Sequence, residues 1–165
     1  MQNISNKLRY INLPFPNHKY IPGKSIHPTK GKNGFHIPNI AKDLSEFNTE
    51  TWHNSQKYLY AIDLFNFGYW WEAHEVLEDL WIQTGKTTSL AKFIQGLIQI
   101  SAALLKDFQS KSQAAEKLAA KGLAKLRLQQ GIFLGIDVKQ FTTDVELYFQ
   151  KKGLIPPSIY LNNKS

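Results

Sequence analysis

The fold is decided by one stretch, residues 64–73, which read Leu64-Phe65-Asn66-Phe67-Gly68-Tyr69-Trp70-Trp71-Glu72-Ala73. Apolar side chains recur at helical spacing on both sides of this stretch, and Gly68 is the residue type that ends a helix. The pattern predicts one helix up to Phe67 and a second from about Tyr69 to Gln83. Because only a few residues separate them, the two helices should form an antiparallel hairpin.

Helical signals continue on both sides of this hairpin. Asn48 or Thr49 can cap the first helix, and Thr87 or Thr88 can cap a third helix that runs to about Phe108. Capping boxes at 110–113 and 143–146 predict a fourth helix to about residue 130 and a short fifth helix that ends near residue 153. No run alternates as a strand does. The expected fold class is therefore all-α, a compact bundle of about five helices.

Length and composition exclude several classes of protein. The chain has 165 residues, which suits one domain, and it has no cysteine, which excludes disulfide scaffolds and thiol nucleophiles. The most apolar run, residues 93–105, is shorter than the ~20 residues that a membrane helix needs. The first six residues do not resemble a secretory signal. These features predict no membrane partner and a cytoplasmic location.

The positive charge belongs to the N-terminal part of the chain. Residues 1–42 hold seven of the 20 Lys and Arg residues and no acid, so the net charge of +7 lies there and residues 43–165 are neutral. Five of the seven prolines also lie in this part. We expect an extended, proline-rich basic arm over 1–42, packed by its aromatic residues on a helical bundle domain over 43–165.

The second helix carries the candidate site. On a helical wheel at ~100° per residue, His74 and Glu78 fall inside the apolar arc, flanked by tryptophans. Glu72, Asp79 and Gln83 fall on the opposite side, which predicts that they face solvent, and Glu75 lies at the border. A buried carboxylate is costly unless it is paired, and residues at i and i+4 can meet.

Such a pair has two interpretations. It is either structural, or it is an acid–base pair or part of a metal site. The candidate catalytic residues are His74 and Glu78, and the candidate ligand-binding residues are Trp71, Trp81, Gln95 and Gln99. The two glutamines can equally belong to the solvent face of the third helix. A divalent metal such as zinc would need a third ligand besides His74 and Glu78, and His27 or His36 could supply it.

The sequence resembles the family called domain of unknown function 309. The resemblance rests on the pattern His-x-x-x-Glu-x-x-Trp, matched by His74, Glu78 and Trp81, and continues through residues 93–99 and 133–137. In the arm, residues 20–23, 27–28 and 34–36 are similar to the family's N-terminus. The resemblance implies a small helical bundle in which His74, Glu78, Trp81, Gln95 and Gln99 belong together. It implies no particular reaction, because no activity is assigned to the family as a whole.

Three functions remain open at this point. The first is a small-molecule or hydrolase-like site around His74 and Glu78. The second is a non-enzymatic interaction module, in which the His–Glu–Trp cluster is structural and the partner is a protein. The third and least favoured is nucleic-acid binding through the basic arm, because seven charges spread over 42 residues make a loose patch.

Overall fold

The computed structural model describes residues 7–25, 40, 46–151 and 155–162. Its elements follow in the order η1 (Trp52–Asn54), α1 (Gln56–Asn66), α2 (Trp70–Gln83), α3 (Ser89–Phe108), α4 (Ser112–Leu126), β1 (Ile132–Phe133), β2 (Ile136–Asp137) and α5 (Val138–Phe149). The five helices confirm the predicted helical bundle. No helix within the described residues has both the length and the apolar character needed to cross a bilayer.

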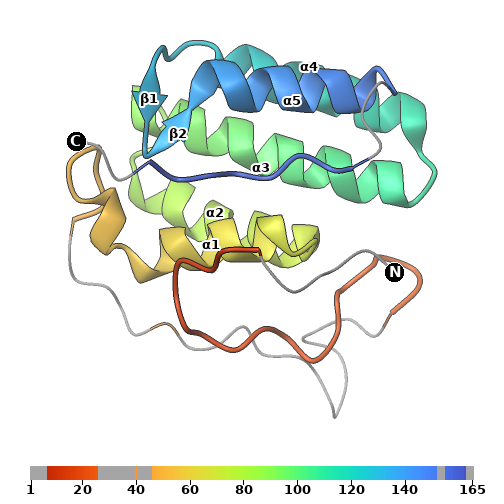
Figure 1. The fold of residues 1–165 in the computed structure, drawn as a ribbon, viewed down its shortest axis with the longest axis horizontal. Helices are drawn as coiled ribbons and strands as arrows, with labels where there is room; N and C mark the ends of the chain where they lie inside the picture. Colours follow the sequence, from red (N-terminus) through yellow and green to blue (C-terminus); the bar gives the residue numbers. More distant parts are fainter. Residues whose placement is uncertain (1–6, 26–39, 41–45, 152–154, 163–165) are drawn as a thin grey trace.

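The helices stack in sequence order, as Figure 1 shows, with α1 and α2 on one side of α3 and with α4 and α5 on the other. The predicted antiparallel hairpin of α1 and α2 is confirmed. Gly68 makes its turn with a φ of 81°, a value that side chains other than glycine rarely adopt. The core lies where α1, α2 and α3 meet, and its largest fully buried side chains include Tyr58, Phe65, Leu77, Leu80, Phe93, Leu97 and Leu104.

Helices α3 and α4 approach closely because each has a glycine at the contact. A Cβ on Gly122 would lie 3.0 Å from the carbonyl oxygen of Gly96, and a Cβ on Gly96 would lie 3.1 Å from that of Gly122. Both distances are tighter than ordinary contact. The two glycines therefore set the separation of these helices.

Three helix starts differ from the prediction, and α4 and α5 also end about four residues earlier than predicted, at Leu126 and Phe149. Helix α1 begins only at Gln56, because the Ser55 hydroxyl caps it by accepting the Tyr58 N–H, and η1 precedes it. The expected box at Ser110 does not cap α4, whose N-cap residue, Lys111, makes no side-chain cap hydrogen bond. Helix α5 begins at Val138 instead of near residue 143, since the Asp137 carboxylate accepts the Gln140 N–H at 3.0 Å.

The prediction of no strand is also wrong, because β1 and β2 form a short antiparallel hairpin. Leu134 and Gly135 join the two strands with φ values of 49° and 76°, as a two-residue turn of the primed type requires. A Cβ on Gly135 would lie 2.5 Å from the indole of Trp52, so the glycine is needed for packing as well. Leu134, a poor residue for positive φ, is held there by its burial and by the Tyr58 hydroxyl, which donates to its carbonyl at 2.8 Å.

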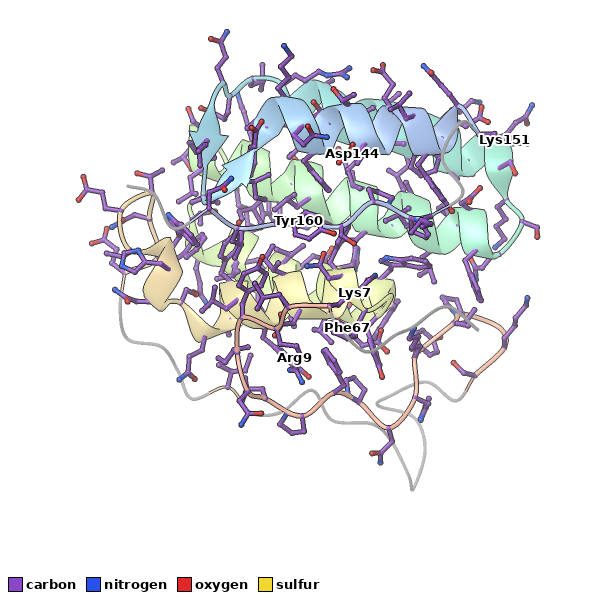
Figure 2. All side chains as sticks on the ribbon, viewed as in Figure 1. Lys7, Arg9, Phe67, Asp144, Lys151 and Tyr160 are labelled. Atoms are coloured by element: carbon purple, nitrogen blue, oxygen red, sulfur yellow. The ribbon has the colours of Figure 1, made fainter. Side chains whose placement is uncertain are left out.

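The described part of the arm, residues 7–25, borders α1 and the start of α2 (Figures 1 and 2). The Asp63 carboxylate of α1, which is fully buried, accepts the backbone N–H groups of Tyr10 and Ile11. It also pairs with Arg9 at 3.3 Å. The division of the chain at residues 42 and 43 falls outside the described residues, so the two-part organisation stays a prediction.

The C-terminal residues 155–162 cross the bundle and contact the arm. The Asn66 side chain pairs with the backbone of Ile159 in both directions, each bond at 2.7 Å. Leu161 forms an antiparallel bridge with Ile136, and its N–H donates to the Tyr10 hydroxyl at 2.8 Å. Polar groups of α1 thus hold two extended segments that are far apart in sequence.

Candidate functional site

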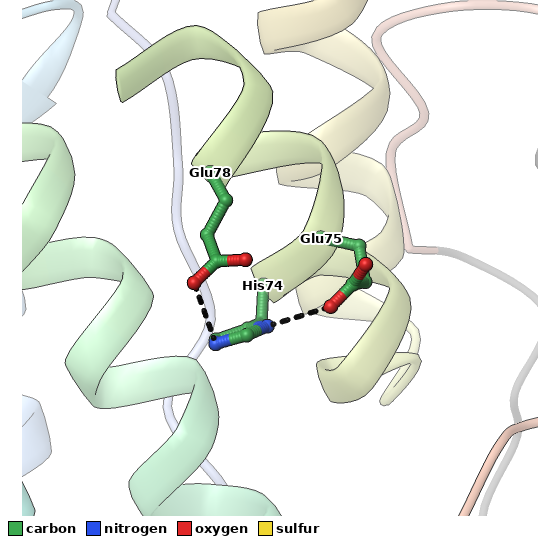
Figure 3. Close-up of side chains that lie close together, drawn as sticks. All are labelled: His74, Glu75 and Glu78. Atoms are coloured by element: carbon green, nitrogen blue, oxygen red, sulfur yellow. Dashed lines mark ion pairs between the residues drawn. The ribbon is translucent and has the colours of Figure 1, made fainter. Parts of the chain in front are cut away.

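The imidazole of His74 on α2 lies between two carboxylates of the same helix (Figure 3). Nδ1 is 3.4 Å from Oε1 of Glu75, and Nε2 is 3.4 Å from Oε1 of Glu78. The contact with Glu78 is the i,i+4 contact that helical geometry provides. The Nδ1 atom is buried, and its contact with Glu75 is at ion-pair distance without the alignment of a full hydrogen bond.

These surroundings shift the protonation of His74. Burial by itself lowers the pKa of an imidazole, since it penalises the charged form. The interaction with Glu75 and the negative charge of Glu78 outweigh burial, and the net effect is a pKa of His74 raised above 6.5. The surroundings of His74 therefore favour its protonated form more than those of a free histidine do.

The site is shallower than the helical wheel predicts. The side chains of His74, Glu75 and Glu78 are 26%, 38% and 47% exposed, so His74 and Glu78 do not form a buried pair. They lie at the rim of α2's apolar face, where solvent reaches them. Sequence reasoning also missed Glu75, although its position next to His74 was visible, because a wheel gives the direction of Cβ and not the reach of a long side chain.

The buried glutamate of α2 is Glu72, so its predicted solvent-facing position is wrong. Glu72 is fully buried, and its Oε1 accepts the Tyr20 N–H at 2.6 Å. Burial raises the pKa of Glu72, and the hydrogen bond from Tyr20 offsets part of that shift. The error arises because a helical wheel takes no account of contacts with other segments. In the structure, the arm covers Glu72 on the face of α2 that the wheel predicts to be exposed to solvent.

The side chains of the candidate ligand-binding residues contact different parts of the structure. The ring of Trp71 packs edge-on against Tyr20, at 4.6 Å between centroids, and Lys86 lies over the ring of Trp81 at 5.3 Å. Oε1 of Gln99 accepts a hydrogen bond from Lys125 of α4 at 3.0 Å, which orients Gln99 toward α4. Gln95 is half-buried on the same stripe of α3. Their grouping with His74 stays a prediction.

The cluster has the composition of a cation site. One ligand atom from each of His74, Glu75 and Glu78 can be chosen so that all three lie within 4.8 Å of one another. Imidazole and carboxylate groups suit zinc and related divalent ions. The predicted third ligands, His27 and His36, lie outside the described residues, so the structure does not test them.

Part of the chain matches a family model. A search of curated proteins found none that matches this chain. Residues 58–118 match the family described as Domain of unknown function (DUF309), a segment that holds almost all of α1, all of α2 and α3, and the first half of α4. His74, Glu75 and Glu78 lie inside the matched segment, whereas the arm and residues 133–137 lie outside it. Over residues 58–118, this chain is similar to the DUF309 family.

Proposed function

We propose that this protein carries a small-molecule site with hydrolase-like acid–base chemistry, and that His74 is its reactive group. The observation that supports the proposal is the imidazole flanked by a carboxylate at each nitrogen, at 3.4 Å in both cases. In acid–base sites, one carboxylate commonly orients a histidine while its other nitrogen exchanges protons with the substrate.

The two glutamates take different roles in this proposal. Glu75 is a positioning residue, whose carboxylate lies 3.4 Å from Nδ1 and orients the imidazole by electrostatic attraction. Nε2 is the nitrogen that donates or receives the proton. Glu78, the more exposed of the two, stabilises the imidazolium and is the second candidate proton acceptor. The raised pKa of His74 suits a group that is protonated in part of the cycle.

A divalent cation is the second candidate, favoured by the compact set of ligand atoms. Nε2 of His74 and the Glu78 carboxylate would supply two of the ligands, and a third would have to come from outside α2. Glu75 would orient the imidazole from the far nitrogen, as outer-shell carboxylates do. Adding Zn²⁺ should then raise the melting temperature of the wild type but not that of His74→Gln. A wild type that does not respond to Zn²⁺ or EDTA would exclude this form of the site.

The nucleic-acid alternative is weakened by the partners of two cations in the described part of the arm. Lys7 donates to the Asn66 carbonyl at 2.7 Å and Arg9 pairs with Asp63, so both cations already have protein partners. This reduces the charge that the described part of the arm can offer to phosphates.

The test is complementation of cells that lack their own copy of the protein. His74→Leu with Glu78→Met removes both ionisable groups while keeping similar volume, and Asp79→Asn is a matched change of an exposed acid on the same helix. We expect the double variant to fold, with unchanged or raised stability, and to fail to restore fitness, while Asp79→Asn restores it. A folded double variant that restores full fitness would exclude a chemical role and favour the interaction module.

A further inference from the structure

A second candidate site is a cavity of about 750 Å³ at one end of the bundle. Four segments that are far apart in sequence line it: the arm at Tyr10, residues between 49 and 59, the hairpin of β1 and β2 at 132–135, and the C-terminal residues 161–162. Figure 1 shows that η1, this hairpin and the C-terminal segment gather at that end. The volume lies within the ~300–1,000 Å³ of small-molecule sites, and the residues around His74 are not among the described residues that line it.

The walls include three aromatic rings, each of which is held in place by another part of the chain. The ring of Trp52 lies against Gly135, where a Cβ would come within 2.5 Å of it. The ring of Phe133 packs on Phe93, with 4.7 Å between centroids, and the Tyr10 hydroxyl accepts a backbone N–H of the C-terminal segment at 2.8 Å. All three wall residues are only half-buried. Because rings that are already ordered lose little entropy on binding, these walls are preorganised for a ligand.

The charge of the walls selects the kind of ligand. The chain has 20 Lys and Arg residues and a net charge of +7, yet no Lys or Arg is among the described residues that line the cavity. The acid in the wall is Glu50, which is exposed and takes part in none of the ion pairs between described residues. The exposed imidazole of His53, also in the wall, can accept a hydrogen bond when it is neutral. This end of a basic protein therefore favours a cation.

A neighbouring cavity repeats this distribution of charge. It shares Thr49 and Phe133 with the first cavity, and a second acid, Glu46, lines it. Lys and Arg are again missing from the described residues of its walls. Glu46 adds negative potential on the same side of the molecule, and it strengthens the preference for a positively charged ligand.

Aromatic faces and a carboxylate together recognise an organic ammonium ion. The face of an aromatic ring attracts a cation, most strongly for tryptophan, and a carboxylate pairs with the ammonium group. We infer that this cavity binds an organic ammonium cation with an apolar body, with the ammonium group at Trp52 and Glu50 and the body against Leu59 and Phe133. Strand β1 has only two residues, which is too short to pair with an added peptide strand, so a small molecule fits better than a peptide.

Titration with 2-phenylethylamine at about pH 8, where an ordinary imidazole is neutral, tests the inference by NMR of the indole N–H resonances. The chain has four tryptophans, and Trp52→Phe assigns the resonance of interest. We expect a saturable shift at Trp52 and none at the tryptophans of α2, which do not line the cavity. 2-Phenylethanol has the same ring without the charge, and 3-phenylpropionate reverses the charge. Both should bind about tenfold more weakly, or less tightly still, because they lose the cation–π contact and the ion pair.

Matched charge reversals separate local recognition from the overall charge of the protein. Glu50→Lys and Glu116→Lys have the same net charge, and Glu116 is an exposed acid of α4 outside the cavity walls. Glu50→Lys should weaken binding of 2-phenylethylamine by about tenfold or more, because it places a cation in the wall, whereas Glu116→Lys should stay within about twofold of the wild type. His74→Gln should keep the affinity, even if the proposed function fails.

Three results would overturn the inference. The first is the absence of a saturable shift at Trp52 with 2-phenylethylamine. The second is equal affinity for 2-phenylethanol, which would show that the charge is not recognised. The third is a Glu50→Lys variant that binds the amine as tightly as Glu116→Lys does.

Discussion

Replacing Asp63 by asparagine should both destabilise the protein and release the arm. The carboxylate is fully buried, with Oδ1 accepting the Tyr10 N–H at 2.9 Å. Oδ2 accepts the Ile11 N–H at 3.1 Å and Nε of Arg9 at 3.3 Å. Asparagine keeps the shape and one acceptor, but its NH₂ group would face two donors in place of Oδ2. The change therefore removes two charge-assisted hydrogen bonds and leaves their donors unsatisfied.

The magnitude follows from those two bonds. Hydrogen bonds to charged groups contribute about 1.5–3 kcal/mol each, and the bond to Arg9 is long, which places it at the lower end. A loss of about 3 kcal/mol in the free energy of unfolding is therefore expected for Asp63→Asn. The loss cannot exceed the free energy by which this part of the arm docks, because undocking lets water satisfy the donors.

Urea denaturation and limited trypsin digestion together measure the effect. Asp63→Asn should lower the urea midpoint and speed cleavage after Arg9. The matched control is Asp79→Asn, whose carboxylate is 64% exposed and pairs with Lys57 at 3.7 Å, and which should change stability by less than about 0.5 kcal/mol. If Asp63→Asn is as stable as the control and trypsin cuts after Arg9 at the wild-type rate, Asp63 does not hold the arm.

Three further predictions concern packing, a buried hydrogen bond and pH. Gly122→Ala should lower stability by about 1–3 kcal/mol in thermal melts, because its Cβ would lie 3.0 Å from the Gly96 carbonyl, and a stabilised variant would show that α3 and α4 can separate freely. Tyr58→Phe should cost about 1–3 kcal/mol in urea denaturation by leaving the buried Leu134 carbonyl without its donor, and no loss would mean that another group satisfies it. Because the pKa of His74 is raised, protonation stabilises the fold, so this contribution is full below about pH 6.5 and disappears as the pH rises through the raised pKa. His74→Gln should lack that part of the pH dependence of the urea midpoint, and an identical pH profile would contradict the raised pKa.

Much of the candidate site could be predicted from local spacing. His74 and Glu78 are one helical turn apart, so their contact follows from the geometry of any helix through residues 74–78. Their exposure could not be predicted in the same way. It depends on how far α3 extends over the rim of α2, and a helical wheel contains no information about neighbouring helices.

Glu72 and Glu78 show most clearly that a helical wheel cannot predict which side chain is buried. Both are glutamates of one helix, and the period assigned Glu78 to the interior and Glu72 to solvent. The arm buries Glu72, since Tyr20, which is 52 residues away in sequence, covers it and donates its N–H. A buried carboxylate needs such a donor, and only the folded chain brings one to it.

The sequence alone determined the helical class, the hairpin turn at Gly68 and the pairing of His74 with Glu78, because each depends on residues within about one helical turn of one another. Tertiary structure alone decided the hairpin of β1 and β2, where a leucine with positive φ is tolerated because Trp52 and Tyr58 pack and bond around the turn. It also decided which glutamate is buried. In both cases, contacts between distant segments supply free energy that outweighs the local preference of the chain.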